Sequence, residues 1–361
     1  MRIGLFIDTM NLGGAESIVM ALAGYIKRAG HVPIIYHFGN AELARYCDQQ
    51  GIGQNRPRGH YWYKKTYRLP FFAWLFSRML KADRIDVLHS HLFGPIVAGA
   101  LACRLAGAAH LGTLHDVYIV EERPIRARLL RAASFLGTRL VCVSEEMAEF
   151  YADIARIPIS RLNVIRNGVD LGRYRVAPQS SRPHSPPRLI MVGRLDRIKR
   201  HDLLFDALKK LPAEIDWRAD IVGDGPERLA LQSQCQRLGL DGRVVFHGQC
   251  GDVPARLAAA DVFALVSDSE GMSLSLIEAL ASGLPVIATR VGNNAEFVND
   301  GRNGYLIEPG DCDALQWALE QLFTDPAMRL RFGANSSQLA NEQLDEERAF
   351  RAYIAAYLDA V

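Results

Sequence analysis

Short, almost wholly apolar runs alternate with amphipathic segments through the first 170 residues. Uninterrupted apolar runs are typical of parallel strands that are buried on both faces of a sheet. The longer segments between them repeat apolar residues at the three- and four-residue spacing of one helix face. The pattern predicts strands at Arg2–Asp8, Val32–His37, Val87–His89, Leu111–Leu114 and Leu140–Val143, with helices at Ala15–Ala29 and Glu145–Tyr151.

A different composition interrupts this alternation over residues 171–187, which hold four prolines and three serines and are typical of a linker. Beyond it the alternation restarts, which favours two separate Rossmann-like domains over one large sheet. We expect an α/β protein with an N-terminal domain over 1–170 and a second domain over 188–345. The restart predicts strands at Arg188–Val192, Trp217–Val222, Val244–His247, Val262–Leu265 and Pro285–Ala288, with helices at His201–Leu211, Glu227–Leu238 and Leu274–Ala281.

The C-terminal segment 346–361 carries apolar residues at helical spacing, from Phe350 through Tyr353 and Tyr357 to Val361. This spacing predicts an amphipathic helix. Such a helix can pack on the second domain or cross back to the first, and the spacing favours neither destination.

The overall composition is that of a globular protein, with 361 residues, 49% of them hydrophobic, and a mean hydropathy near zero. This apolar content excludes a disordered chain, and the length favours two domains. The longest uncharged apolar run, Leu92–Cys103, is twelve residues, short of the ~20 that a membrane-spanning helix needs. Asp8 interrupts the N-terminal apolar run, so no signal peptide is predicted. The six cysteines form no CxxC pair, which is typical of reduced thiols in a cytoplasmic protein.

The formal net charge of +2 conceals opposite charges in the two halves of the chain. Residues 1–170 hold 21 Lys and Arg against 14 Asp and Glu, a net charge of +7, whereas residues 171–361 hold 21 against 26. A basic half of this size indicates an anionic partner.

Candidate ligand sites are sought directly after strands, because ligands of Rossmann-like domains bind at the carboxyl ends of the strands. The first predicted strand is followed by Gly13 and Gly14 at a helix start. The segment lacks the GxGxxG pattern of dinucleotide-binding domains. The two glycines let backbone N–H groups approach an anion, or they form a tight turn that requires positive φ.

In the second domain, Gly193-Arg194 and Lys199 follow the first strand and flank a predicted helix start. Two cations beside a helix N-terminus suit a pyrophosphate, although a basic cluster can also be a solvated surface. The next strand runs into the turn Gly223-Asp224-Gly-Pro226, where a purely structural turn also explains Asp224.

The stretch 267–285 holds the most specific pattern of the chain. Glu270 lies in the loop after an apolar strand, and Glu278 lies in the first turn of the helix that follows. Two carboxylates beside a helix end that binds phosphate can accept hydrogen bonds from the hydroxyls of a sugar or a ribose. For Glu278 the alternative is a capping box with Ser275, three residues earlier.

These motifs resemble the retaining glycosyltransferases of family 4, and the resemblance covers nearly the whole chain. It implies the GT-B architecture, in which two Rossmann-like, doubly wound domains face each other across a cleft. The motifs that carry it are Gly13-Gly14-Ala15-Glu16, Asn167-Gly-Val-Asp170, Gly193-Arg194 with Lys199, Gly223-Asp-Gly-Pro226, and Glu270 with Glu278 at the E-x7-E spacing.

The resemblance implies a role for each matching residue. Arg194 and Lys199 would hold the donor diphosphate, Glu278 the ribose hydroxyls and Glu270 the donor sugar. His115, which follows the strand Leu111–Leu114, would hydrogen-bond the transferred sugar or stabilise charge at the reacting centre. The implied catalytic set is His115, Glu270, Arg194 and Lys199, and the implied donor-binding set is Gly13, Gly14, Arg194, Lys199, Gly223, Gly248, Glu270, Met272, Ser273, Leu274, Ser275 and Glu278. The family often has glycine where this chain has Ser273.

The resemblance further implies transfer of a hexose-type sugar from a UDP- or GDP-sugar to a glycan or lipid-linked acceptor, with retention of configuration. The expected mechanism is front-face attack, in which the leaving diphosphate oxygen accepts the proton of the acceptor. No carboxylate is placed for a double displacement. Alternatives are a sugar-nucleotide epimerase or NAD-linked enzyme on a similar scaffold and a non-catalytic nucleotide-sugar-binding subunit.

No metal is expected in the site. His89 and His91 form a HxH pair that can chelate a metal ion, but no further carboxylate or cysteine joins them at ligand spacing. Arg194 and Lys199 already offer counter-charges to a diphosphate. A purely structural role, as a hydrogen-bonded histidine at a strand end, is a better explanation for His89 than for His115.

Residues 56–84 hold eight Lys and Arg, one acid and interleaved aromatic residues. This composition favours an anionic membrane surface, on the inner face of the cytoplasmic membrane, that presents a lipid-linked acceptor. A core-packed helix with a solvated face explains the same pattern. Aromatic and basic segments also bind single-stranded nucleic acid, but the donor-site resemblance argues against nucleic acid.

Overall fold

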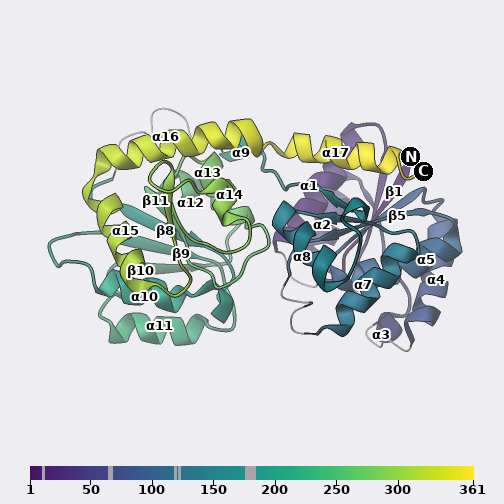
Figure 1. Cartoon of the computed structure of the whole chain (residues 1–361), viewed down its shortest axis with the longest axis horizontal. Helices are drawn as coiled ribbons and strands as arrows, with labels where there is room; N and C mark the ends of the chain where they lie inside the picture. The colour runs from purple at the N-terminus through teal and green to yellow at the C-terminus, as the bar shows by residue number, and fades with distance from the viewer. Residues whose placement is uncertain (10–12, 64–67, 118–119, 121–122, 175–183) are drawn as a thin grey trace. The chain divides into compact units, whose positions relative to one another are not determined.

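The computed structural model describes residues 1–9, 13–63, 68–117, 120, 123–174 and 184–361. The chain forms two compact units (Figure 1). Unit 1 consists of Met1–Asn167 together with Glu347–Val361, and unit 2 consists of Gly168–Glu346. The chain therefore leaves unit 1 once, builds unit 2 and returns to unit 1 at its C-terminal end.

Unit 1 is built on a parallel sheet, whose described strands lie in the order β3-β2-β1-β4-β5-β6-β7. The chain adds strands on one side of β1 and then crosses to the other side at β4, which is a doubly wound topology. The strands are β1 (Arg2–Phe6), β2 (Val32–Tyr36), β3 (Gly53–Asn55), β4 (Val87–His91), β5 (Ala109–Leu114), β6 (Arg139–Cys142) and β7 (Leu162–Val164).

Helices cover both faces of this sheet, as buried parallel strands require. Alternate residues of β1 enter different cores, because successive side chains of a strand point to opposite faces. Ile3 and Leu5 pack with α1 (Gly14–Arg28) and α2 (Ala41–Gln50), whereas Phe6 packs with α4 (Leu69–Ala82) and α5 (Phe93–Ala106). The remaining described helices are α3 (His60–Tyr63), α7 (Ile125–Phe135), α8 (Glu145–Ile154) and the 3-10 turn Ile159–Arg161.

The C-terminal helix α17 (Glu346–Leu358) completes the core of unit 1. Phe350, Tyr353 and Tyr357 are buried among the residues of β1 and α1. The helical spacing therefore reflects a face packed on the first sheet, where the polypeptide began.

Unit 2 repeats the architecture with a parallel sheet in the order β10-β9-β8-β11-β12-β13. Its core lies between the sheet and helices such as α10 and α15, and α13 packs against α16 and α9. The strands are β8 (Arg188–Val192), β9 (Arg218–Val222), β10 (Val244–Gly248), β11 (Val262–Leu265), β12 (Val286–Thr289) and β13 (Gly304–Ile307). The helices are α9 (Leu171–Tyr174), α10 (His201–Lys209), α11 (Arg228–Arg237), α12 (Val253–Ala258), α13 (Leu274–Ala281), α14 (Asn294–Phe297), α15 (Cys312–Thr324) and α16 (Pro326–Gln343), and Arg197–Lys199 form a 3-10 turn.

The predicted class of two Rossmann-like, parallel α/β domains is confirmed. The strands Arg188–Val192 and Val262–Leu265 and the helix Leu274–Ala281 have the predicted bounds. The sequence pattern did not indicate β3, β7 and β13, which are edge strands of three or four residues. β3 and β7 bury too few side chains to leave an apolar run, and in β13 the run is limited to Tyr305, Leu306 and Ile307.

The segment 171–187 begins as a helix. Leu171–Tyr174 form α9 within unit 2, and residues 175–183 of this segment lie outside the described part of the chain. No helix among the described residues combines the length and apolar character that crossing a bilayer requires.

Candidate active site

The candidate donor site of unit 2 lies where β8 and β11 are neighbours, which is the point at which the order of the sheet reverses. Ligands of doubly wound sheets bind outside the carboxyl ends of the strands at such a point. The loops that follow the two strands touch there, because the backbone N–H of Asp268 donates to the carbonyl of Ile198 at 2.8 Å. Both loops carry residues that the sequence motifs single out.

Lys199 and Glu270 form an ion pair at this point. Lys199 Nζ lies 2.6 Å from Glu270 Oε1, and the two side chains are 21% and 8% exposed. The Ser267 hydroxyl donates to the same carboxylate oxygen at 2.6 Å. Asp196 fixes the base of Lys199, because its carboxylate caps the 3-10 turn and accepts from the Lys199 backbone N–H. A half-buried ammonium and a nearly buried carboxylate are therefore held at the end of the sheet.

Arg194 differs from Lys199 in its exposure. Its side chain is 70% exposed, and its Nε lies 3.1 Å from the carboxylate of Asp196. Arg200, in contrast, is tied between Asp202 and Asp268 and joins the two loops rather than facing solvent. Arg194 is thus a cation at the same strand end that can move toward an anion.

Gly223 allows two loops of the site to approach each other. A Cβ at Gly223 would lie 1.9 Å from the carbonyl oxygen of Gly193, and the residue has a φ of +137°. Its N–H donates to the carbonyl of Gly248 at 2.9 Å, and Gly248 itself has positive φ. The Asp224 carboxylate accepts from Gly225 N–H and from Arg228, as a structural turn would have it.

Helix α13 begins beside Glu270 without a side-chain cap. Ser273 is its N-cap residue and makes no capping hydrogen bond with its side chain, which lies 3.1 Å from the Ser275 hydroxyl. Met272 and Ser273 are buried, and Leu274 and Ser275 are half-buried. The capping box of Ser275 with Glu278 is not formed, because the helix starts two residues earlier than that pattern requires. Its first N–H groups therefore need another acceptor.

Glu278 instead accepts a hydrogen bond from the Tyr174 hydroxyl at 2.7 Å. Tyr174, on α9, is buried, and burial raises the pKa of both groups. Tyr174 lies in the segment interpreted as a linker, so the sequence pattern did not single it out. The sequence signal for this residue was the aromatic side chain of Tyr174 at helical spacing after Asp170.

In unit 1, Gly13 and Gly14 start α1 after the end of β1. Gly13 is the N-cap residue with extended backbone (φ −145°), so the tight turn of positive φ is wrong. A Cβ at Gly13 would lie 3.0 Å from the buried carboxylate of Glu16, which accepts from the Thr9 hydroxyl. The first glycine thus accommodates a buried carboxylate under the helix start.

The end of β5 presents His115 next to the end of β4. His115 Nε2 lies 3.1 Å from His91 Nδ1, and burial lowers the pKa of His115 to about 4. His89 is fully satisfied by the hydroxyls of Tyr357 and Thr113, each at 2.7 Å. Among the described residues, no group of three or more His, Cys, Asp or Glu side chains could hold a metal ion.

The segment 56–84 has two faces where it is described. Phe72, Phe76 and Leu80 of α4 are buried in the core of unit 1. On the opposite side, Phe71 and Trp74 are 48% and 45% exposed. The helix therefore combines a core-packed face with exposed aromatic residues.

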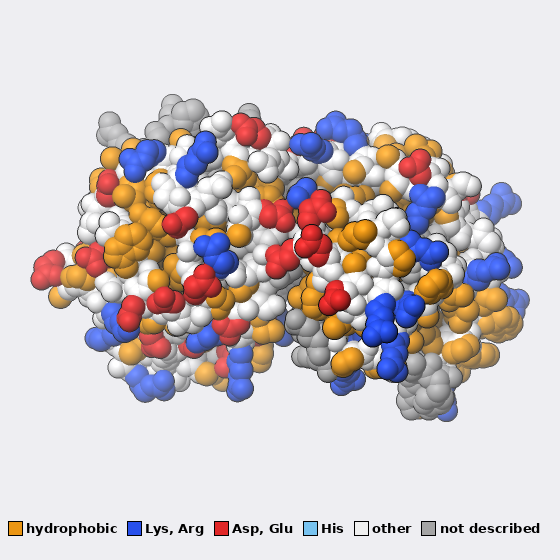
Figure 2. Space-filling view, viewed as in Figure 1, with side chains coloured by type: hydrophobic (Ala, Val, Ile, Leu, Met, Phe, Trp, Pro, Cys, Tyr) orange, Lys and Arg blue, Asp and Glu red, His pale blue; other side chains and the backbone are white. Residues whose placement is uncertain are grey.

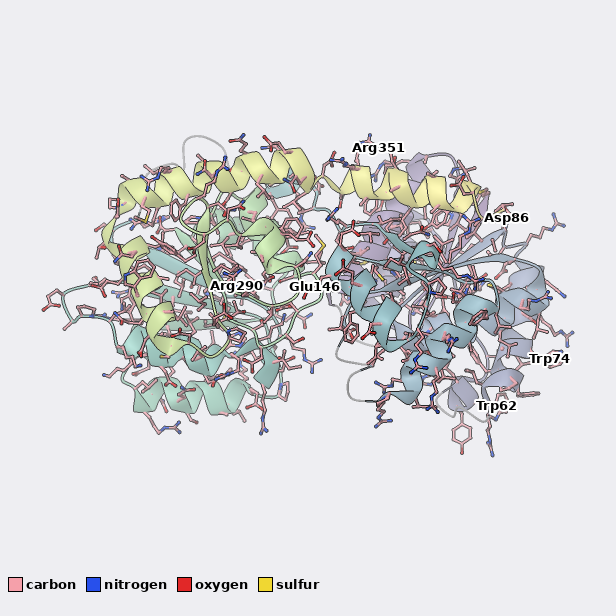
Figure 3. All side chains as sticks on the ribbon, in the orientation of Figure 1. Trp62, Trp74, Asp86, Glu146, Arg290 and Arg351 are labelled. Atoms are coloured by element: carbon pink, nitrogen blue, oxygen red, sulfur yellow. The ribbon has the colours of Figure 1, made fainter. Side chains whose placement is uncertain are left out.

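Cations lie over these exposed rings. The Arg78 guanidinium lies 5.2 Å from the centroid of Trp74, and that of Arg68 lies 5.6 Å from Tyr61, which is 62% exposed. Trp62 of α3 and Trp74 of α4 come from neighbouring helices (Figure 3), and hydrophobic and basic side chains adjoin over this part of unit 1 (Figure 2). Lys64, Lys65 and Tyr67 of the segment lie outside the described residues.

Two Rossmann-like units in one chain are the architecture of the GT-B fold, to which the similar solved structures belong. The crystal structure of HepE from Anabaena in complex with UDP and glucose matches with a TM-score of 0.87, over 100% of both chains, at 23% identity. The sequence pattern described as Glycosyltransferase Family 4 matches residues 12–173, and that of Glycosyl transferases group 1 matches residues 175–339. The chain therefore belongs to the group 1 glycosyltransferases, with an N-terminal half of the family 4 type.

Relatives of known name are similar over most of the chain. N-acetyl-alpha-D-glucosaminyl L-malate synthase of Bacillus anthracis is 27% identical over 81% of this chain and 80% of its own length. UDP-Gal:alpha-D-GlcNAc-diphosphoundecaprenol alpha-1,3-galactosyltransferase of Escherichia coli is 29% identical over 70% of each chain. The chain is thus a glycosyltransferase, and the predicted enzyme class is confirmed at that level.

Proposed function

We propose that this protein transfers a hexose from a UDP-sugar to a lipid-linked glycan, with retention of configuration at the anomeric carbon. The observation that carries the proposal is the Lys199–Glu270 pair at the β8/β11 switch point, beside the uncapped start of α13. The choice of UDP and of a lipid diphosphate acceptor follows the name of the Escherichia coli relative and the UDP of the HepE complex.

Unit 2 binds the nucleotide in this proposal. The N–H groups of Leu274 and Ser275 and the cations Lys199 and Arg194 hold the diphosphate, since a helix start and two cations favour negative charge. Glu278, a half-buried carboxylate that already accepts from the Tyr174 hydroxyl, also accepts from the ribose hydroxyls. The strand end at Gly248 lies beside the base. Glu270 holds a hydroxyl of the sugar, and Gly14 offers its backbone N–H to the phosphates.

The chemical step follows from these charges. The acceptor hydroxyl attacks the anomeric carbon on the face that the diphosphate leaves, and the leaving oxygen takes the hydroxyl proton. Lys199, Arg194 and the start of α13 stabilise the charge that develops on the diphosphate. These cations supply the counter-charge, so transfer is expected to persist in EDTA. His115 contacts the transferred sugar in this proposal.

A nucleotide-sugar screen tests the donor assignment. In thermal-shift measurements with UDP-, GDP- and ADP-sugars, the UDP-sugars should raise the melting temperature of the protein. Addition of the acceptor should then release UDP. Lys199→Met should abolish the release. Arg197→Met is the matched control, because Arg197 lies on the same 3-10 turn and its side chain is 90% exposed. Binding of a sugar nucleotide without release of a nucleoside diphosphate by any acceptor would leave the non-catalytic subunit, and interconversion of two sugar nucleotides would establish an epimerase.

We also propose that the exposed face of α3 and α4 docks on an anionic membrane that carries the acceptor. Exposed aromatic rings under guanidinium groups suit the interface of such a membrane. Phe71→Ser with Trp74→Ser should reduce sedimentation with vesicles of phosphatidylglycerol and phosphatidylcholine. Trp317→Ser, at an exposed tryptophan of unit 2, should not. Equal sedimentation of all three proteins would refute the docking face.

A further inference from the structure

Histidine side chains gather on one face of β4 and β5 in unit 1. His89 and His91 are two residues apart on β4, and Thr113 and His115 are two residues apart at the end of β5. Residues two apart on a strand share a face, and β4 pairs with β5 so that His91 lies opposite Thr113. His115, the first residue after β5, continues this face, and the strand geometry therefore brings His91 and His115 together.

The contact between the two rings is a hydrogen bond. His91 Nδ1 lies 3.1 Å from His115 Nε2. His91 is fully buried, whereas His115 is half-buried. Burial lowers the pKa of both rings, so both are neutral at pH 7. In a bond between two neutral imidazoles, one nitrogen donates its proton and the other accepts with a lone pair.

The second nitrogen of His91 decides which ring donates. His91 Nε2 is buried and has no hydrogen-bond partner within the described part of the chain. If His115 donated, His91 would keep its proton on Nε2 as a buried N–H without an acceptor, an arrangement that folded proteins rarely tolerate. If His91 donates from Nδ1, its Nε2 is a bare lone pair and no buried proton is orphaned.

We propose that His91 is a positioning residue that donates from Nδ1 to His115 Nε2 and thereby holds His115 in the tautomer protonated on Nδ1. The bond fixes which nitrogen of the partner carries the proton. The ring of His115 then carries its N–H donor on Nδ1. This inference rests on the proposed function in one respect, which is that His115 contacts the transferred sugar.

A consequence for the reaction follows. A neutral Nδ1–H donates a hydrogen bond to an oxygen of the sugar and cannot remove a proton from it. His115 would therefore orient the sugar and stabilise partial negative charge on its oxygens, and it would not serve as a general base through that nitrogen. His91 touches no substrate and acts only through His115.

Nitrogen-15 NMR of protein labelled at histidine tests the tautomer directly. In the wild type, His115, assigned from a His115→Ala spectrum, should show a protonated Nδ1 and a bare Nε2. His91→Leu should release the ring to the Nε2–H form, which a free imidazole favours. His91→Asn places an amide near the position of Nδ1 and should restore the wild-type pattern. A wild-type His115 protonated on Nε2, or a pattern unchanged in His91→Leu, would overturn the proposal.

Kinetics separate positioning from mere structure. His91→Leu should lower kcat at least tenfold with an unchanged affinity for UDP, and His91→Asn should recover most of kcat. The matched control is His110→Gln, a buried histidine on the opposite face of β5 that bonds Ser90 and Thr138 and not His115. It should leave both the tautomer and kcat unchanged. If the wild type transfers no sugar, the proposed function fails, and the wild-type spectrum still decides the role of His91.

Discussion

Acid should destabilise this protein through histidines that are buried in their neutral form, and His110 allows the effect to be isolated. Its ring is 4% exposed and lies between the hydroxyls of Ser90, at 2.9 Å, and Thr138, at 2.8 Å. Burial lowers the pKa of His110 to about 3, against about 6.5 in an unfolded chain. Between these values the unfolded state binds a proton that the folded state does not, so the free energy of unfolding falls as the pH falls.

The magnitude follows from the two pKa values. From pH 8 to pH 5 the unfolded state gains about 2 kcal/mol from protonation of this one histidine, while the folded state gains almost nothing. His89 and His91 are fully buried, and burial lowers the pKa of each well below its usual value. These two groups act in the same direction as His110, so acid should destabilise unit 1 through several buried histidines. In the described part of unit 2, His201 is a comparable group, whose pKa burial lowers to about 4.

The assay compares wild type with His110→Gln. Urea unfolding at pH 8 should show the variant less stable by about 1 kcal/mol, because the glutamine keeps one of the two hydrogen bonds. At pH 5 the gap should close or reverse, since the variant lacks the titrating ring. Comparing the two proteins cancels the contribution of every other group to the pH dependence of the free energy of unfolding. One of these groups is Glu16, whose pKa is raised by burial, so that its contribution has the opposite sign. Hydrogen exchange at pH 5 should show β4 and β5 opening before β8 and β9. A gap that is the same at both pH values would refute the reasoning.

Three further changes probe the site of unit 2. Tyr174→Phe removes only the hydroxyl that bonds Glu278, so the affinity for UDP measured by calorimetry should fall about fivefold at an unchanged Tm, and an unchanged affinity would exclude positioning by Tyr174. Glu278→Gln should weaken UDP binding at least tenfold while Tm stays level or rises, because burial disfavours the charged carboxylate; a lower Tm with normal affinity would make Glu278 structural. Gly223→Ala would bring a Cβ against the carbonyl of Gly193 and should cost more than about 2 kcal/mol in urea unfolding, and a neutral result would contradict the close packing of the two loops.

The fold class could be predicted from the sequence because parallel strands that are buried on both faces consist of uninterrupted runs of apolar residues. Positions at the ends of those runs were predictable for the same reason, and both Lys199 and Glu270 lie in loops that follow strands; their ion pair was not predicted. The sequence pattern did not show which side chain each of these site residues bonds. Tyr174 bonds Glu278 across 104 residues of chain, and no periodicity connects them.

The contact between His91 and His115 was easier to predict than the bond between Tyr174 and Glu278. The residues share a face by the alternation of two neighbouring strands, but the register between β4 and β5 sets their contact, and register comes from packing rather than from local sequence. The destination of the C-terminal helix was open for a related reason. An apolar stripe predicts that a helix is buried, while the surface that buries it depends on the whole chain.

That destination has a consequence for synthesis. Because Phe350, Tyr353 and Tyr357 fill the core beside Ile3, the first domain to emerge from the ribosome lacks part of its interior until these three residues have been added. Unit 2, a continuous segment, has its full set of residues earlier. A nascent chain should therefore hold a folded second domain while the first still exposes an apolar face to chaperones, and premature termination near residue 345 should release a protein that degrades rather than one that works poorly.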